Sequence, residues 1–501
     1  MTGSRLIARN TMLNVVGQVV PMLAAVVAIP LLIRALGPAR FGVLTLAQAA
    51  IGYFSLFDLG LGRALTQLVA ERLGADRPVD EISEVAWTAM ALMLALGVIG
   101  AVVLGALTPV IVRRGLNIPP ELMHETRIAF YLLAVSLPCV VATAGLRGLL
   151  EAHQHFGTAN ALRVPLAVLT FVGPLAVLPY STSLIAVTST LVVARYATFV
   201  AHAVVCARRY PELTRESRPR ARSVRPLIRT GGWMTVSNVV SPLMSYLDRF
   251  LIGGVFPLAV VAYYVTPYEL VSRLLILPQA MLAAFFPAFA ATFAQNRGRT
   301  ALLFDSSMRA TMLIMFPVLF VLALFAREGL TIWVGPEFAA HGAPVLQWLC
   351  VGVFLNALAQ APFAVLQGTG RSDLTAALHV LELPIYIAGL WWLAHRFGLV
   401  GVAMAWTIRV AIDTTVLTVL ARRQFTLELA RGWRVPPATL ILVAGIGAAS
   451  LPSGGSVKVV AALIAATLFS LGAWRFLVSA DERTSIRGIT DATVLRGPSV
   501  P

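Results

Sequence analysis

Long apolar runs separated by short polar segments dominate the chain. A bilayer core of ~30 Å is crossed by about 20 apolar residues in a helix, and about fourteen runs meet that requirement. The pattern therefore predicts an all-α polytopic membrane protein with about 14 transmembrane helices. The predicted spans cover about 12–36, 41–62, 84–112, 128–149, 160–180, 183–206, 231–256, 259–292, 310–326, 342–366, 375–395, 398–421, 435–451 and 457–478.

Composition agrees with this pattern. The 501 residues are 58% hydrophobic and 12% charged, whereas a soluble domain carries about 25% charged residues. The net charge of +16 could suggest a nucleic-acid partner. Most of the 39 Lys and Arg residues, however, fall in loops that the predicted spans place on one side of the membrane. This excess is the positive-inside signal, and it predicts that both termini are cytoplasmic.

The most basic loop, residues 208–229, contains eight arginines. A topology signal explains it, and a patch for lipid headgroups or a partner is the alternative. The loop also separates two similar halves. Leu146-Arg147-Gly148 with Pro165 in the first half corresponds to Leu366-Gln367-Gly368 with Pro384 in the second. Each half has six predicted spans, an even number, so the repeats are parallel and enclose a cleft. The predicted organisation is a six-helix lobe (1–207), a cytoplasmic linker (208–229), a second six-helix lobe (230–430), helices 13 and 14 (431–479) and a cytoplasmic tail (480–501).

Ionisable residues within the spans mark the candidate site. Asp248 and Arg249 interrupt the seventh span, and a charge in the bilayer costs about 2.5–3.5 kcal/mol on insertion scales. Glu269 in the eighth span lies at a depth similar to that of Asp248, and Arg273 lies one helical turn deeper on the same helical face. These four residues are expected to form one network. Arginines bind phosphate oxygens, and buried carboxylates accept a proton or a cation. Static ion pairs that brace the lobe are the alternative. Further polar residues within the spans include Asn14, Gln18, Arg195, Asn238, His379, Glu382, Arg409 and Asp413.

The sequence contains no recognisable catalytic or nucleotide-binding motif. His153 and His155 form an HxH pattern without nearby cysteine, so no metal site is expected. Walker A, GxSxG and GxGxxG motifs in a strand-turn-helix context are absent. The sequence therefore predicts a transporter without catalytic residues or cofactors, driven by a substrate gradient or by a coupling proton or Na⁺.

Several motifs, in order along the whole chain, resemble the polysaccharide/oligosaccharide flippases, the Wzx-like family of the MOP exporter superfamily. They are Leu36-Gly37-Pro38-Ala39-Arg40-Phe41-Gly42, Asp58-Leu59-Gly60-Leu61-Gly62-Arg63-Ala64, Tyr246-Leu247-Asp248-Arg249-Phe250-Leu251-Ile252-Gly253, Trp333-Val334-Gly335-Pro336-Glu337-Phe338 and Leu366-Gln367-Gly368-Thr369-Gly370-Arg371. The resemblance implies alternating-access transport of an undecaprenyl-diphosphate-linked oligosaccharide, an O-antigen or exopolysaccharide unit, across the bacterial inner membrane. Membrane lipids, and a glycan polymerase or other biosynthesis proteins, are the implied partners.

In this family the first, second, seventh and eighth spans line the cavity. The resemblance therefore places Arg273, Arg249, Asn238, Gln18 and Asn14 among the expected substrate-binding residues, and Asp248, Glu269, Asp58 and Arg63 among the expected coupling or gating residues. Arg409 and Asp413, a charged pair four residues apart in the twelfth span, are further expected coupling or gating residues. The first span lacks the interior arginine or aspartate of the lipid II flippase branch, which argues against that branch.

Two alternatives stay open. A cation-coupled multidrug antiporter of the same superfamily would usually have twelve spans and a less cationic cavity. A membrane-embedded glycan polymerase or ligase typically needs a large outside loop, and the predicted outside loops are all short.

Overall fold

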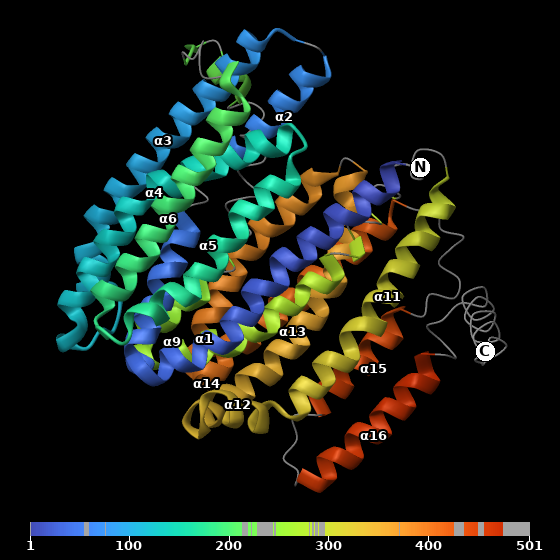
Figure 1. The fold of residues 1–501 in the computed structure, drawn as a ribbon. Helices are drawn as coiled ribbons and strands as arrows, with labels where there is room; N and C mark the ends of the chain where they lie inside the picture. The colour runs from blue at the N-terminus through green and yellow to red at the C-terminus, as the bar shows by residue number, and fades with distance from the viewer. Residues whose placement is uncertain are drawn as a thin grey trace, which may run out of the picture. The chain divides into compact units, whose positions relative to one another are not determined.

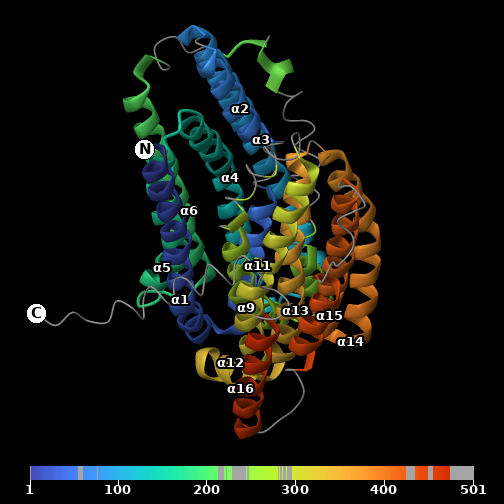
Figure 2. The same ribbon diagram turned by 90° about the vertical axis from the view of Figure 1, so that its right-hand side faces the viewer.

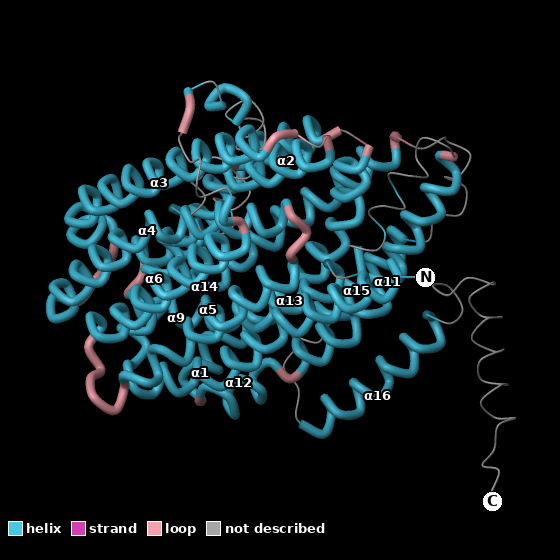
Figure 3. The backbone as a smooth tube through the Cα atoms, turned by 45° about the horizontal axis from the view of Figure 1, so that its top comes forward, coloured by secondary structure: helices cyan, strands magenta, loops and turns pink. Residues whose placement is uncertain are grey.

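The computed structural model describes residues 2–54, 60–75, 77–212, 219–221, 223–227, 244, 247–279, 281–282, 285, 289, 296–369, 371–424, 435–448 and 455–473. Within these residues the backbone forms helices, turns and short irregular links, and none of them belongs to a strand (Figure 3). The predicted all-α class is confirmed.

Thirteen α-helices are delimited in the described part of the chain (Figure 1). They are α1 (Thr2–Phe54), α2 (Leu61–Gly74), α3 (Val79–Val110), α4 (Met123–Ala152), α5 (Phe156–Val177), α6 (Leu184–Arg209), α9 (Leu258–Ser272), α11 (Arg297–Leu324), α12 (Ala326–Val334), α13 (Pro336–Gly368), α14 (Ser372–Arg422), α15 (Val435–Ala448) and α16 (Gly455–Gly472). Three short turns accompany them: η2 (Ile111–Gly115), η3 (Pro120–Leu122) and η4 (Arg273–Leu275).

The helices have the length and surface of membrane spans. Among the described residues, nine helical stretches are long and apolar enough to cross a bilayer. They are Val20–Gly52, Val79–Gly115, Pro120–Ala152, Phe156–Val177, Leu184–Arg209, Leu258–Gln279, Arg297–Leu324, Pro336–Gln367 and Asp373–Arg422. Large apolar side chains are exposed along their outer faces, for example Ile99, Val102 and Val110 on α3. Because lipid covers such faces favourably, the protein is a multi-pass membrane protein.

Two of the longest helices bend at a glycine. In α1 the kink lies at Gly37, with φ 75° and ψ 162°, and in α14 it lies at Gly398, with φ 60° and ψ −141°. These backbone conformations are open essentially only to glycine. Each kink falls where the apolar pattern predicts a break between two spans, after residue 36 and after residue 395.

Two predicted loops contain helices instead. Helix α2 occupies part of the loop predicted between residues 62 and 84, and α12 part of the loop predicted at 327–341. Both helices are short and amphipathic. Leu65 and Val69 of α2 and Leu330 of α12 are buried. Charged residues such as Glu71 of α2 and Arg327 of α12 are exposed. A membrane-length window misses such helices, because only one stripe of each is apolar.

The predicted eighth span, 259–292, is interrupted as well. Helix α9 ends at Ser272, and η4 tightens the backbone over Arg273–Leu275 before helical residues resume at Ile276. Pro278 lies four residues after Leu274 and has no N–H with which to bond the Leu274 carbonyl. A tighter turn at this point accommodates the missing α-helical hydrogen bond.

Tertiary contacts divide the chain into two units, Met1–Leu270 with Ala376–Val402 (unit 1) and Val271–Thr375 with Ala403–Pro501 (unit 2). In unit 1, α4 packs against α3 and α6, and α5 packs along α1, as Figure 2 also shows. In unit 2, α13 packs against α11 and α12, and α15 packs on α11. The predicted boundaries at residues 207, 229, 430 and 479 remain predictions.

Candidate functional site

The helical residues 247–255 and helix α9 carry the candidate site in unit 1. A tight connection joins them: the Phe256 N–H donates to the Ile252 carbonyl over 2.8 Å, and the Val260 N–H donates to the Pro257 carbonyl over 2.9 Å. Polar side chains of the two helices are therefore brought together.

The Asp248 carboxylate is fully buried, with 0% of the residue exposed. The Tyr264 hydroxyl donates to its Oδ2 over 2.6 Å, and the Arg249 backbone N–H donates to its Oδ1 over 2.7 Å. Tyr264 is itself completely buried. A buried carboxylate needs donors of this kind because it has lost its water, so Tyr264 fixes the position of Asp248.

The Arg249 side chain contacts a different acid. Its Nη2 donates to Glu269 Oε1 over 3.1 Å, and its guanidinium carbon lies 5.1 Å from the centre of the Tyr268 ring. The Arg249 side chain is 8% exposed and that of Glu269 is 29% exposed. The cation is thus held by a carboxylate and an aromatic face, and the carboxylate is the more accessible member of the pair.

The first part of α14 adds further polar groups to unit 1. His379, Glu382 and Tyr386 are buried and follow one another at helical spacing. Tyr386 lies close enough to Tyr264 for their hydroxyls to interact electrostatically. Tyr386 therefore belongs to the surroundings of Tyr264, although more than 100 positions separate the two tyrosines.

The predicted network is confirmed in part. Asp248, Arg249 and Glu269 come together as expected from their depth. Arg273 begins η4 and belongs to unit 2, as do Arg409 and the buried Asp413 on α14. Their assignments remain predictions.

The structure does not describe the side chains of five other predicted site residues. Asn14 and Gln18 lie in α1, and Arg63 lies in α2, at positions where only the backbone is described. Asp58 and Asn238 lie outside the described residues. Their assignments also stay predictions.

Sequence reasoning missed Tyr264 and Tyr268. Neither residue carries a charge at neutral pH, and tyrosines are common in apolar spans. The sequence did contain a signal: Tyr268 directly precedes Glu269, and Tyr264 lies one helical turn before Tyr268, on the same helical face.

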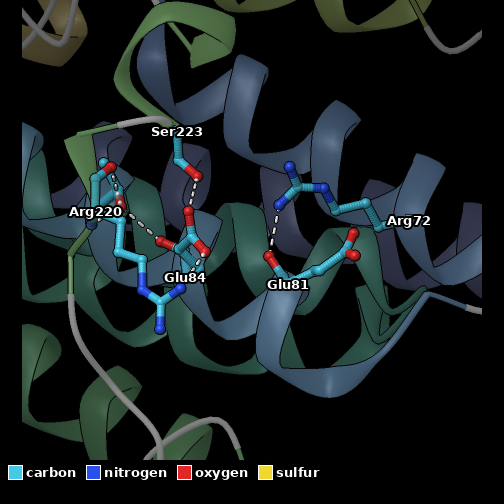
Figure 4. A network of polar contacts seen from close by, with 6 residues as sticks. Arg72, Glu81, Glu84, Arg220 and Ser223 are labelled. Atoms are coloured by element: carbon cyan, nitrogen blue, oxygen red, sulfur yellow. Dashed lines mark hydrogen bonds and ion pairs between the residues drawn. The ribbon is translucent and has the colours of Figure 1, made fainter.

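A second polar cluster lies at the start of α3, where Arg220 and Ser223 of the 208–229 segment contact that helix (Figure 4). Ser223 donates its hydroxyl hydrogen to Glu84 Oε1 over 2.6 Å, and Arg220 Nη1 lies 3.7 Å from Glu84 Oε2. The Arg220 backbone N–H donates to Thr88 Oγ1 over 3.0 Å. Glu84 and Ser223 are both buried. The basic segment is therefore attached to the first helices at this point.

The HxH pattern forms a third cluster, between α4 and α6. His155 Nδ1 lies 2.6 Å from the Tyr210 hydroxyl, and the His153 ring lies 4.2 Å from the Tyr210 ring. Burial, together with the nearby charge of Arg209, lowers the pKa of His155. Burial raises the pKa of Tyr210 to about 12. The two histidines pack against a tyrosine, an arrangement that brings helix ends together.

Comparisons with known proteins decide the family. The family model described as "Polysaccharide biosynthesis protein" matches residues 7–293. A putative O-antigen transporter from Shigella flexneri is 31% identical over 423 residues, which are 83% of this chain and 98% of the relative. The chain belongs to the polysaccharide biosynthesis protein family. The recognition of a Wzx-like family member from the sequence motifs is confirmed, and the relative from Shigella flexneri is named as a transporter.

Solved structures show that this family member has the MOP superfamily fold. An inward-facing multidrug resistance MATE family transporter of that superfamily superimposes with a TM-score of 0.68 at 18% identity, over 82% of this chain and 97% of the other. The lipid II flippase MurJ, in an inward closed conformation, superimposes with a TM-score of 0.71 at 11% identity, over 94% of this chain and 100% of the other. At these identities the likeness establishes the fold alone.

Proposed function

We propose that this protein is a flippase that moves an undecaprenyl-diphosphate-linked oligosaccharide across the bacterial inner membrane. The transported lipid is an O-antigen or exopolysaccharide repeat unit. The observation that carries this proposal is the match to nearly the full length of a putative O-antigen transporter. The proposal includes about 14 spans in two parallel six-helix repeats, cytoplasmic termini, and alternating access between the lobes. A glycan polymerase and other biosynthesis proteins are the expected partners.

Arg249 and Arg273 are the proposed contacts for the diphosphate. A guanidinium presents paired N–H donors that match phosphate oxygens. Arg249 supports this assignment because its buried side chain reaches a carboxylate, an anion that a phosphate can replace. Asn14, Gln18 and Asn238 are the proposed neutral hydrogen-bonding groups for the sugar-diphosphate.

Asp248 and Glu269 are the proposed sites for a coupling proton or Na⁺, with Asp58, Arg63, Arg409 and Asp413 as further coupling or gating residues. The Arg249–Glu269 pair gives coupling a definite sign. A phosphate must compete with the Glu269 carboxylate for Arg249, so protonation of Glu269 favours phosphate binding. By linkage, phosphate binding then favours proton uptake, and proton and substrate bind together. An inward proton gradient would therefore not drive export through this pair. Export would instead be driven by removal of the transported product on the outside.

A flippase-deficient strain tests the function directly. Expression of this protein, together with the genes for its own glycan, should restore glycan display. Purified protein in liposomes should make a fluorescent lipid-linked oligosaccharide accessible to a glycosidase on the opposite side. Failure of both assays with well-folded protein would exclude the flippase.

A cation-coupled multidrug antiporter is the second candidate, because the fold is shared with a multidrug resistance MATE transporter. The same liposomes distinguish the two functions. Gradient-dependent uptake of a cationic dye without any glycolipid movement would favour the antiporter.

A further inference from the structure

The ends of α4 and α6 and the start of α5 come together in unit 1, where both α4 and α5 pack against α6 (Figure 1). Arg147 lies five residues before the end of α4, Arg163 lies seven residues after the start of α5, and His202 lies seven residues before the end of α6. We call these three residues the α4–α6 cluster.

The two arginines of the cluster share one acid. Arg147 Nε lies 3.3 Å from Oε1 of Glu151, which is one turn further along α4. Arg163 is half-buried and lies within electrostatic range of both Arg147 and Glu151. In the part of the chain that the structure describes, Arg163 forms no ion pair or hydrogen bond. Because one carboxylate cannot neutralise two guanidinium groups, and like charges repel more strongly away from water, the cluster lacks an anion.

His202 lies on the inner side of the cluster and is also incompletely bonded. The residue is 1% exposed, and its ring is close enough to Arg147 for an electrostatic interaction. Its Nδ1 donates to the Thr198 carbonyl over 2.8 Å, whereas its Nε2 is buried and has no hydrogen-bond partner among the described residues. Buried polar atoms usually have partners, so the chain alone does not satisfy the cluster.

Further arginines extend the positive charge toward the helix ends. Arg208 and Arg209 are exposed in the last turn of α6, and Arg209 Nη1 donates to Thr158 Oγ1 in the first turn of α5 over 2.8 Å. Glu151 is the only acid in the last three turns of α4 and α6 and the first three turns of α5. These helix ends therefore present a cationic surface that an anion would complement.

The cluster lies at the depth of lipid phosphates. The positive-inside signal places it on the cytoplasmic side, because the basic segment 208–229 directly follows α6. At 1.5 Å per residue, Arg147 lies about 8 Å and Arg163 about 10 Å from its helix end. That depth is close to the boundary between headgroups and hydrocarbon, and an arginine side chain can extend from it to the phosphates.

We propose that the α4–α6 cluster binds the phosphate of an anionic phospholipid from the cytoplasmic leaflet. Guanidinium groups match phosphate oxygens, and basic pockets between transmembrane helices bind anionic headgroups. The exposed side chains of Val204 and Val200 on α6 offer an apolar face for an acyl chain next to the cluster. The bound lipid neutralises the second arginine and stabilises the packing of the three helices. The site shares no residue with Asp248, Arg249 and Glu269, and its binding chemistry does not depend on the transported substrate.

Lipid titration of the purified full chain in a neutral detergent tests the site, with bound lipid counted by native mass spectrometry and melting temperature measured in parallel. Phosphatidylglycerol should bind and raise the melting temperature, and phosphatidylcholine, which has no net charge, should do so far less. Arg163→Gln should weaken the apparent affinity for phosphatidylglycerol about tenfold or more, the effect of losing one charge-assisted hydrogen bond. Glu151→Gln should have the opposite effect and strengthen binding, because it removes the acid that competes for Arg147.

Two controls separate binding from folding and from general charge. Without phosphatidylglycerol, Arg163→Gln should be at least as stable as the native chain, because it removes a half-buried cation that has no partner among the described residues. Arg113→Gln combined with Arg114→Gln, which removes two exposed arginines from η2, should leave lipid affinity unchanged. Native-like affinity in folded Arg163→Gln protein, or an equal loss in the η2 variant, would overturn the proposal.

Inorganic phosphate and a photoreactive lipid identify the source of the anion. Inorganic phosphate should stabilise the native chain less than phosphatidylglycerol does, and equal stabilisation would assign the site to a free anion and contradict the lipid proposal. In liposomes, phosphatidylglycerol with a photoreactive headgroup should label peptides from residues 143–163 and 198–209. Labelling confined to other peptides would also overturn the proposal. None of these measurements uses a transport assay, so a failure of glycolipid transport would count against the proposed function alone.

Discussion

The Tyr264 hydroxyl donates a 2.6 Å hydrogen bond to the fully buried carboxylate of Asp248, while the neighbouring Arg249 side chain extends to Glu269. Adjacent opposite charges thus have separate contacts. Asp248 is fixed by Tyr264, and Arg249 contacts the more exposed acid. Because the two side chains have different partners, mutations can test the contributions of Asp248 and Arg249 separately.

Tyr264→Phe should destabilise the protein, because it removes a hydrogen bond to a charged acceptor, which is worth about 1.5–3 kcal/mol. Asp248→Asn should weaken the same contact and should lower transport. Thermal unfolding in detergent measures the effect. Tyr131→Phe on α4, where the ring is exposed, is the control. Equal stability of the Tyr264→Phe and Tyr131→Phe proteins would contradict the assignment.

The Arg249–Glu269 pair is open to a double-mutant cycle. Glu269→Gln should destabilise the protein by up to about 3–5 kcal/mol, because it leaves the buried Arg249 charge without its carboxylate partner. Arg249→Gln should cost less, because the Glu269 side chain left behind is 29% exposed. The double variant should recover much of that stability.

Transport decides what the pair does. If Arg249 binds the diphosphate, the double variant stays inactive although it is stable again, and Glu269→Gln retains substrate binding. Recovery of transport together with stability in the double variant would show that the pair only braces the helices.

Glu84→Gln should loosen the basic segment, because the buried Glu84 carboxylate holds both Ser223 and Arg220. Trypsin, which cleaves after arginine, should then cut near Arg220 faster in inside-out vesicles. Glu81→Gln, one turn earlier on α3, is the control, since its backbone carbonyl rather than its side chain bonds Arg72 (Figure 4). The same cleavage rate in both variants would rule out an anchoring role for Glu84.

Helix α16 is attached to α12 through the chain's single lysine. Lys458 Nζ donates to Glu328 Oε1 over 2.7 Å, and this bond lowers the pKa of Glu328 below its usual value of 4.5. A carboxylate with a lowered folded-state pKa stabilises the folded protein above its ordinary pKa. That contribution is lost as the pH falls through the lowered value.

Lys458→Met should therefore reduce thermal stability at neutral pH, and the difference from the native chain should shrink as the pH falls through the lowered pKa of Glu328. Melting curves from pH 3 to pH 7 give the comparison. If the difference in melting temperature persists unchanged at pH 3, the stabilisation comes from packing of the lysine's aliphatic chain and not from the ion pair.

Gly37→Ala should destabilise α1 by about 1–3 kcal/mol, the usual cost of a side chain in a glycine-only backbone region. Gly105→Ala on α3 should be stabilising by about 0.5–1 kcal/mol, because that glycine is helical with open space around it. Equal effects of the two substitutions on thermal unfolding would argue against a strained kink.

The sequence by itself determined the class, the family and most of the spans, because hydrophobic length is a local property that a bilayer imposes directly. It also located Asp248, Arg249 and Glu269 at one depth, since helical rise converts residue number into distance. Tertiary structure decided which groups meet: that Tyr264 binds Asp248, that Ser223 reaches Glu84, and that Gly42 lies against Leu258. These contacts join residues from 16 to more than 200 positions apart. They depend on how helices pack, and apolar periodicity does not specify that packing because both lipid and protein neighbours satisfy an apolar face.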